Sequence, residues 1–383
     1  MLDRRTFLKM GGVGIAGVVL VPLLDGCEQH TVTPLMAPEL VPFLTPQSSL
    51  FVQHGGEGSI PTWAMPDIKQ DEWKLEIGRQ LGANFSENLT ITFADLMQAK
   101  ADGAEITFLK TMQCILESPL RVSATGYTGN AYWTGIPLKH FLDKAGIDYN
   151  TNRRILLYGA DKPSNGSRQF GFINNLTVDR IVNGESQGLF PPMLAYAMNG
   201  EPLTREHGFP VRLIVHEMYG FSNVKWLVRA AATTVNTDTG TYQSEGYTER
   251  VMQASSRGTS IRQEAVIPSG ATIIRGVAIS GHAAIEKVEI SIDNGAFVPA
   301  TLTPLTEIQD QESLPPSIQQ LSKGTAYPYQ GVWTPWTFQW NAPAGDHTIA
   351  IRATDKAGNT QPDPDDSISD GQNGVVKYKV KAN

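Results

Sequence analysis

The hydrophobic pattern of this chain changes near residue 250, and that change constrains the fold more than any other feature. Upstream of it, β-like runs such as residues 73–77 alternate with helical stretches such as residues 137–142. Downstream of it, runs of strand composition such as residues 285–292 follow one another, separated by turn residues. We therefore expect an α+β domain at about residues 45–250 and a β-sandwich at about residues 251–383.

The length of the chain indicates how many domains it forms, and its net charge indicates which partners it can attract. At 383 residues the chain exceeds the roughly 250–300 residues at which one hydrophobic core stops growing, which supports two domains. The 36 glycines and 24 prolines imply many turns, and the Pro- and Gln-rich residues 303–328 are expected to form a long loop within the sandwich. A formal net charge of -7 gives no field that would attract nucleic acid, so no nucleic-acid partner is expected.

The first residues have the composition of an export signal. Arg4-Arg5 stands before the apolar, glycine-rich residues 10–24, a stretch shorter than the roughly 20 residues that span a bilayer. A signal peptide over residues 1–27 is expected, the alternative being an amphipathic surface helix. The arginine pair resembles a twin-arginine signal, although Asp3 stands where serine or threonine is usual. That route generally exports proteins already folded around a cofactor, which implies a periplasmic or cell-envelope location.

The signal ends in a segment that resembles a bacterial lipobox. Leu24-Asp25-Gly26-Cys27 places a cysteine where lipid is attached after cleavage, although Asp25 fits that pattern poorly. Two outcomes are open: a lipid anchor through Cys27, or a soluble product from which Cys27 is removed with the signal. Residues 28–44, which contain three prolines, are expected to form an extended tether.

Cysteine content singles out one side chain of the mature protein. With Cys27 in the processed segment, Cys114 is the only remaining cysteine, so an intramolecular disulfide is excluded. Cys114 is then either a buried inert thiol or a functional thiolate. A soft thiolate is a suitable ligand for a redox-active transition metal.

Two sequence blocks favour the functional interpretation. Thr-Met-Gln-Cys at residues 111–114 is followed by Tyr-Trp-Thr-Gly-Ile-Pro-Leu at residues 132–138. Residues 196–227 then contain Asn-Gly-Glu-Pro-Leu, His-Gly-Phe-Pro-Val-Arg and Val-Lys-Trp-Leu in that order. These blocks resemble the sulfite oxidase family of molybdopterin-dependent oxidoreductases. The resemblance implies that the Cys114 thiolate ligates molybdenum in a molybdopterin cofactor (Moco), with Trp133 as a catalytic residue in a segment beside the metal.

The same resemblance implies a set of cofactor-binding residues. Arginine offers phosphate oxygens a planar fork, lysine offers a point charge, and backbone N–H groups are further donors, all of which suit a phosphorylated pterin. Weaker matches add His54 and Asp161, for which the alternatives are a loop histidine and a turn aspartate. The full implied set is His54, Asp161, His207, Arg212, Asn223, Val224 and Lys225.

A third segment adds one candidate catalytic residue. Gln243 and Tyr247 lie four residues apart and resemble a family segment whose tyrosine lies at the metal. The resemblance implies that Tyr247 could donate a hydrogen bond to a metal oxo group or to a substrate oxygen. The alternative is a structural tyrosine.

The segment after Cys114 departs from the family pattern. Sulfite oxidases have an arginine there for their anionic substrate, whereas Pro119 stands at that position here and Glu117 adds negative charge. Arg121 comes two residues late, and Gln53 replaces, or is displaced from, another active-site arginine. Losing one charge-assisted contact to an anion costs roughly 1.5–3 kcal/mol, so these residues weigh against sulfite as the substrate.

The C-terminal half resembles the dimerisation domain of the same family, which is an immunoglobulin-like β-sandwich and implies a homodimer. The implied activity is a two-electron oxidation of sulfite or a related sulfur compound. Because the sequence has no Cys-x-x-Cys-His haem motif, the electrons are expected to pass to a separate carrier such as a c-type cytochrome. The alternatives are a reductase of sulfoxides or other oxo compounds on the same fold, and an exported binding protein without metal.

Overall fold

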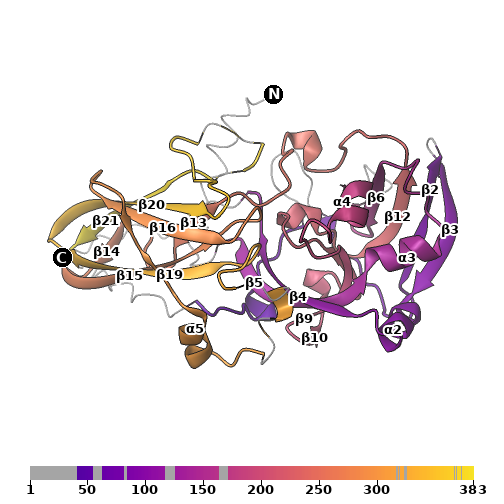
Figure 1. Ribbon diagram of the computed structural model, residues 1–383, viewed down its shortest axis with the longest axis horizontal. Coiled ribbons are helices and arrows are strands. Elements are labelled where there is room, and N and C mark those ends of the chain that lie inside the picture. Colours follow the sequence, from indigo (N-terminus) through magenta and orange to yellow (C-terminus); the bar gives the residue numbers. More distant parts are fainter. Residues whose placement is uncertain are drawn as a thin grey trace, which may run out of the picture.

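A mixed domain and a strand-rich domain lie side by side along the long axis of the molecule (Figure 1). The expected signal, residues 1–27, and the first part of the expected tether, residues 28–40, lie outside the described residues. No helix in the described part of the chain is long and apolar enough to cross a membrane. The computed structural model describes residues 41–54, 63–81, 84–116, 126–163, 171–315, 318, 320–322, 326–365, 367, 369–371 and 373–383.

Two sheets form the framework of the first domain. One runs in the order β3-β2-β12-β6-β8. Strands β12 and β2 are parallel, and every other neighbouring pair in this sheet is antiparallel. The other runs in the order β10-β9-β5-β4, and β11 also pairs with β9. The first sheet consists of β2 (Lys74–Leu81), β3 (Asn84–Thr92), β6 (Arg154–Gly159), β8 (Ile173–Thr177) and β12 (Leu227–Thr233). The second consists of β4 (Ile106–Gln113), β5 (Thr128–Pro137), β9 (Met193–Met198), β10 (Glu201–Pro202) and β11 (Arg212–Ile214).

Short helices and one small ribbon complete this domain. Apolar side chains of α2, α3 and α4 share one core with the first sheet and with β9 and β11, so this core lies between the two sheets. The ribbon pairs β1 with β7 in antiparallel fashion. These elements are α2 (Phe93–Ala101), α3 (Leu138–Lys144), α4 (Val178–Asn183), β1 (Trp63–Ala64), β7 (Lys162–Pro163) and the 3-10 turns η1 (Gln47–Ser49), η2 (Arg205–His207), η3 (Gly220–Ser222) and η4 (Gln243–Glu245).

Helix starts follow the local sequence. Thr92 is the N-cap of α2: its side chain accepts a hydrogen bond from the backbone N–H of Asp95, and the Asp95 carboxylate accepts from the backbone N–H of Thr92 at 2.7 Å. This reciprocal pair satisfies two donors that the helix itself leaves open. The helical stretch expected at residues 137–142 begins one residue later, because Pro137 is the last residue of β5 and the N-cap of α3.

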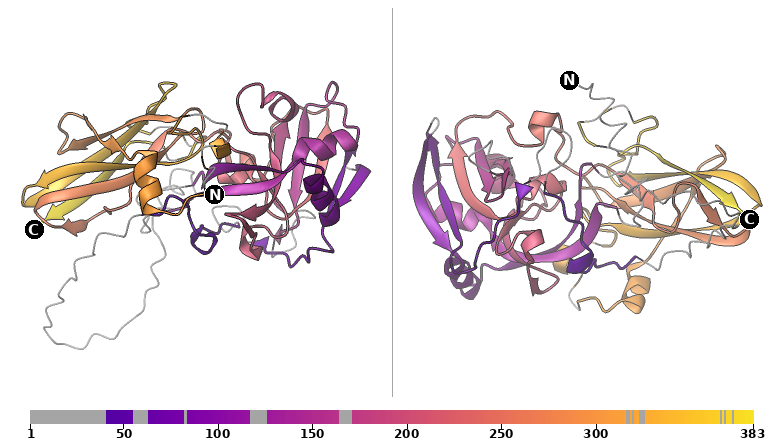
Figure 2. Two further views of the ribbon diagram at one scale, coloured as in Figure 1. Left: turned by 60° about the horizontal axis from the view of Figure 1, so that its bottom comes forward. Right: turned by 180° about the vertical axis from the view of Figure 1, so that it is seen from behind.

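The second domain is a sandwich of two sheets, seen from two further directions in Figure 2. Their orders are β13-β15-β19-β18 and β14-β21-β20-β16-β17, and apolar side chains between them form a separate core. Its first strand begins at Ser255, close to the expected boundary. The strands are β13 (Ser255–Gly258), β14 (Ala265–Ile267), β15 (Gly270–Ile279), β16 (Ile285–Ile292), β17 (Val298–Pro299), β18 (Thr301–Leu302), β19 (Thr334–Ala342), β20 (Gly345–Asp355) and β21 (Val376–Ala382).

The long loop expected at residues 303–328 lies between strands β18 and β19, but it also contains short helical elements. This stretch contains α5 (Leu305–Gln311) and the 3-10 turn η5 (Gln320–Ser322). Leu305 and Ile308, which lie three residues apart on α5, are both buried in a core shared by the two domains. That burial gives the short helix an apolar anchor which the Pro- and Gln-rich composition concealed.

Strand β4 is held against the sandwich just before Cys114. The backbone N–H of Trp333 donates to the Thr111 hydroxyl at 2.7 Å, and the backbone N–H of Thr111 donates to the Gly331 carbonyl at 2.8 Å. The indole of Trp333, which is fully buried, donates to the Phe43 carbonyl at 3.0 Å. The second domain therefore fixes the strand that presents the cysteine.

Candidate functional site

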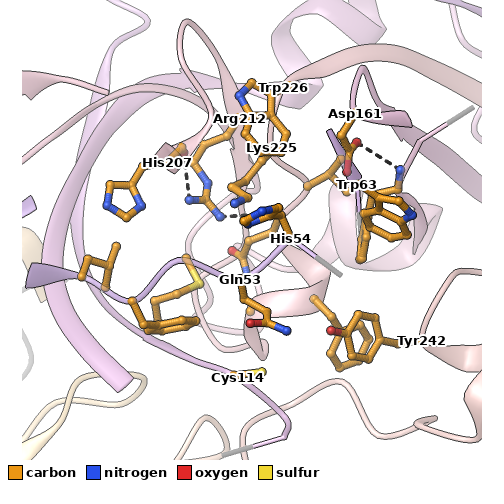
Figure 3. A pocket seen from close by; sticks show the side chains of 18 residues that line it. Gln53, His54, Trp63, Cys114, Asp161, His207, Arg212, Lys225, Trp226 and Tyr242 are labelled. Atoms are coloured by element: carbon orange, nitrogen blue, oxygen red, sulfur yellow. Dashed lines mark hydrogen bonds between the residues drawn. The ribbon is translucent and has the colours of Figure 1, made fainter. Parts of the chain in front are cut away.

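A cavity of about 700 Å³ opens in the first domain at the end of β4. Its lining comes from segments far apart in the sequence: the N-terminal segment, β4, the turn after β6, and the stretch from η2 to η4. Cys114 and all seven expected cofactor-binding residues are among them (Figure 3). The lining residues are Leu50, Phe51, Gln53, His54, Trp63, Met112, Cys114, Asp161, Phe172, His207, Arg212, Gly220, Phe221, Asn223, Val224, Lys225, Trp226 and Tyr242.

Cys114 directly follows the last residue of β4. Its backbone N–H donates to the Tyr127 carbonyl at 2.9 Å, which continues the pairing of β4 with β5 to the cavity wall. The side chain is 6% exposed and lines the cavity. A thiolate here would reach a bound metal from a rigid strand end, and the remaining metal ligands would come from the cofactor.

Arg212 and Lys225 form the cationic part of the cavity. The two terminal nitrogens of Arg212 donate to the carbonyls of His207 and Asn223, each at 3.0 Å, and Lys225 donates to the Glu206 carbonyl at 2.9 Å. Within the described residues, the buried Nε–H of Arg212 has no hydrogen-bond acceptor. The two side chains are thus held in place by backbone carbonyls, with donor capacity left for an anion.

A glycine allows these two cations to lie close together. Gly208 has φ +102°, and a Cβ there would lie 3.1 Å from Cβ of Arg212 and 3.2 Å from Cβ of Lys225. Any other residue would therefore be strained and crowded at this position. His207, just before it, bonds through Nε2 to the Gln47 carbonyl at 2.9 Å, so the turn is anchored to the N-terminal segment.

Burial shifts the titration of every charged group in this part of the cavity. Burial, together with the charge of Arg212, lowers the pKa of His207 to about 4 and that of Lys225 to about 7. Burial alone lowers the pKa of Arg212 to about 9. Burial raises the pKa of Asp161 to about 6, although the backbone N–H of Phe172 donates to its carboxylate at 3.1 Å. The negative charge near Arg212 and Lys225 therefore does not balance the cost of burying them, as expected of a site for a phosphate group.

Two residues expected to be catalytic are not among the described side chains that line this cavity. Trp133 on β5 is fully buried, and its ring lies behind the guanidinium of Arg212, 5.2 Å from Cζ to the ring centroid. Tyr247 is buried behind Tyr242, with the ring centroids 5.9 Å apart. Trp133 thus supports a cation, and Tyr242 supplies a ring that faces the cavity.

Sequence reasoning missed two further features. The first is a group of aromatic rings on the cavity wall, contributed by four segments that share no sequence spacing. The second is buried charge outside the pair Arg212 and Lys225, which we call the cradle. Lys110 on β4 is fully buried and donates to the carbonyls of His216 at 3.0 Å and Met218 at 2.6 Å, while Arg180 pairs with Glu217 at 2.6 Å. A lysine within a strand of apolar composition was the available signal for this second feature.

Comparisons with known proteins match both domains. The description "Oxidoreductase molybdopterin binding domain" belongs to a family model that matches residues 62–241, and "Mo-co oxidoreductase dimerisation domain" to one that matches residues 246–380. The mitochondrial sulfite oxidase of Macaca fascicularis is 27% identical over an alignment of 361 residues that covers 85% of this chain and 59% of that relative. The chain belongs to the sulfite oxidase family. The predicted family, its molybdopterin cofactor and the oxidoreductase class are confirmed.

Other relatives of this sulfite oxidase-type protein differ in their chemistry. An inducible NADH nitrate reductase of Glycine max is 25% identical, over 84% of this chain and 37% of the relative. The crystal structure of the sulfane dehydrogenase SoxCD from Paracoccus pantotrophus superposes with a TM-score of 0.66 at 22% identity, over 90% of this chain and 82% of that chain, which confirms the fold. The chain spans about 59% of the length of the sulfite oxidases it matches.

The described residues of the sulfite oxidase-type cavity fit molybdopterin. Arg212 and Lys225 suit the phosphate, since the Nε–H of Arg212 has no acceptor among the described residues, whereas His54 and Asp161 present polar atoms suited to a pterin ring. The side-chain amide of Asn223 is already bonded to the backbone of Val215 and Tyr219. Cys114 lines the same cavity and would supply one soft ligand to a metal bound there. The segment in which the family arginine is missing, residues 117–125, lies outside the described residues.

Replacing Lys225 by methionine is expected to stabilise the cofactor-free protein at pH 6 by about 1 kcal/mol. The folded-state pKa of Lys225, about 7, lies below the value of about 10.4 in an unfolded chain. The cost of burying the charge is therefore fully present below pH 7 and disappears as pH rises toward 10. Thermal unfolding of wild-type and Lys225→Met protein at pH 6 and at pH 9.5 measures this, with Lys69→Met at an exposed site as the control. Equal gains at both pH values would contradict it.

Proposed function

We propose that this protein is an exported molybdenum enzyme that oxidises sulfite or a related sulfur compound by two electrons. The observation that carries the proposal is the single cavity that both the Cys114 thiol and the cations Arg212 and Lys225 line. When bound, the cofactor supplies two-electron oxygen-atom transfer with water as the oxygen source. Similarity to mitochondrial sulfite oxidases over 85% of the chain supports a sulfur substrate.

Different residues of the cavity hold the cofactor phosphate, the pterin ring and the metal in this proposal. Arg212 and Lys225 bind the phosphate of the cofactor and so fix its position. Asp161 and His54 contact the ring system, and the raised pKa of Asp161, about 6, lets it carry or release a proton near neutral pH. Cys114 donates charge to the metal from the end of β4, and the partly closed cavity limits access of water.

The electrons leave singly to a separate carrier, for which a c-type cytochrome is the expected partner. The chain contains no Cys-x-x-Cys-His motif and no second cysteine in its mature part, so it supplies no haem or cluster of its own. The purified enzyme is therefore expected to reduce cytochrome c or ferricyanide much faster than it reduces molecular oxygen. Stopped-flow reduction of cytochrome c compared with oxygen uptake, at equal substrate concentration, measures this. A comparable rate with oxygen would contradict the proposed carrier.

Location and assembly are part of the same proposal. Arg4-Arg5 directs export, and Cys27 is either removed with the signal or lipidated. The dimerisation domain at residues 246–380 pairs two copies into a homodimer. Fractionation of cells expressing the full chain tests the location, and light scattering of the purified protein tests the assembly.

A second function on the same fold is the reduction of sulfoxides. Gln53 in the cavity and Pro119 in the sequence, where arginines bind the anion in the family, favour a substrate without full negative charge. Metal analysis of protein purified from a molybdenum-replete host comes first, since a folded protein without molybdenum and pterin would be a binding protein. Steady-state rates with sulfite and with methyl sulfoxides then separate the two enzymes.

A further inference from the structure

Four aromatic side chains form a continuous wall on one side of the cavity. Trp63 and Phe172 meet edge to face with centroids 5.3 Å apart, Phe172 and Tyr242 lie 5.9 Å apart, and Phe221 stacks on Tyr242 at 5.4 Å with an interplanar angle of 20°. All four line the cavity, and three of them are less than 7% exposed. We call this group the aromatic wall.

The Tyr242 end of the aromatic wall lies away from the cations, whereas its Trp63 end lies near Asp161 (Figure 3). In Figure 3, Arg212 and Lys225 lie toward the top of the view, Cys114 lies at the bottom, and the amide of Gln53 lies between them. Tyr242 lies beside Cys114 in that view, at the same end. Among the described lining residues, Arg212 and Lys225 are the only arginine and lysine. Both donate to backbone carbonyls at the end of the cavity proposed for the cofactor phosphate.

Among the described residues at the Cys114 end of the cavity, a substrate therefore meets rings and an amide. Sulfite is a small oxyanion, with two charges when deprotonated and no apolar surface that the wall could cover. A related compound in which one sulfite oxygen is replaced by a carbon substituent has one charge and an apolar face. Burying a phenyl-sized group contributes roughly 1.5–3 kcal/mol, which corresponds to about 10- to 100-fold in affinity.

We propose that the aromatic wall selects an organic sulfinate, R–SO₂⁻, whose apolar substituent R packs against Phe221 and Tyr242 while its sulfur faces Cys114. This inference rests on the proposed function and names its substrate class. The reaction is R–SO₂⁻ + H₂O → R–SO₃⁻ + 2 H⁺ + 2 e⁻. A new S–O bond forms at the sulfur lone pair, both O–H bonds of water break, and the protons pass to solvent. The two electrons pass singly to the one-electron carrier.

The test compares benzenesulfinate with sulfite on the molybdenum-loaded enzyme, with ferricyanide as acceptor and enzyme-free blanks. The ratio of kcat/KM for benzenesulfinate to that for sulfite is expected to be about tenfold or more in favour of benzenesulfinate. In Tyr242→Ala this ratio is expected to fall by about tenfold, because the stacked face is lost. Tyr149→Ala is the matched control, since Tyr149 bonds to Asp143 on the outer surface and does not line the cavity.

A binding measurement provides a readout that does not depend on turnover. Benzenesulfonate, the product, is titrated calorimetrically into the loaded wild-type enzyme, Tyr242→Ala and Tyr149→Ala. Its Kd is expected to rise about tenfold in Tyr242→Ala and to stay unchanged in Tyr149→Ala. An equal effect in both variants, or none in Tyr242→Ala, overturns the assignment of the wall.

The remaining outcomes separate this inference from the proposed function. A loaded enzyme that oxidises sulfite better than benzenesulfinate overturns the sulfinate and leaves the proposed function standing. A loaded enzyme that oxidises neither compound but reduces methyl phenyl sulfoxide overturns both and identifies the sulfoxide reductase. Protein that folds but contains no molybdenum also overturns both.

Discussion

Replacing Cys114 by serine is expected to lower turnover by about 10³-fold or more, which corresponds to at least about 4 kcal/mol of activation free energy. Serine keeps the shape of the side chain, but its hydroxyl does not ionise near neutral pH and is a hard ligand. The side chain is 6% exposed at the end of β4, so no second soft ligand from solvent can take its place without displacing the strand. The loss therefore lies in the chemistry rather than in the fold.

Three measurements on this variant separate chemistry from folding. Circular dichroism and thermal unfolding of Cys114→Ser should match wild type, and pterin content should remain within about twofold, since the cradle residues bind the phosphate independently of the thiol. Ile115→Val is the matched control, because Ile115 is buried next to Cys114 in the sequence and does not line the cavity. This variant should lose only about 1 kcal/mol of unfolding free energy. Full activity in Cys114→Ser would refute the assignment of the sulfur as the metal ligand.

The residues that the family resemblance implied for cofactor binding line one cavity, and most of them are local in the sequence. His207, Arg212 and the residues 223–225 fall in one contiguous block, in which a short strand and two tight turns bring their side chains to one face. The order of the two domains followed from periodicity, which differs visibly between a mixed domain and a sandwich. Local patterns of this kind survive in a single sequence because they depend on neighbouring residues only.

Features that depend on which face of an element is turned inward could not be predicted. Spacing placed Trp133 near Cys114, but alternation along β5 turns its ring toward Arg212 and away from the cavity lining. Tyr247 matched a motif by spacing, whereas η4 turns Tyr242 to the cavity and leaves Tyr247 behind it. The aromatic wall needs four distant segments to meet, and no pattern within any one of them signals that meeting.

Buried charge was missed for a related reason. Lys110 lies in a strand whose other residues are largely apolar. Only the tertiary structure supplies the carbonyls of His216 and Met218, which accept hydrogen bonds from its ammonium group. A buried ammonium without such acceptors would be strongly destabilising. Strand β4, which ends just before Cys114, is thereby hydrogen-bonded both to the turn at residues 216–218 and to Trp333 of the second domain.

Replacing Arg212 by methionine is expected to reduce the molybdenum and pterin content of the purified protein by about 10- to 100-fold, because one or more charge-assisted bonds to phosphate, worth roughly 1.5–3 kcal/mol each, are lost. The guanidinium is buried, stacks on Trp133 and uses a planar fork to reach the carbonyls of His207 and Asn223. Arg212→Lys keeps the charge but loses the fork, so it should retain only part of the cofactor. Metal analysis and fluorescence of the released pterin measure both variants, and Arg229→Met, which removes a surface pair with Glu76, is the control that should remain fully loaded. Normal cofactor content in Arg212→Met would mean that the phosphate lies elsewhere and that this arginine only supports the turn around Gly208.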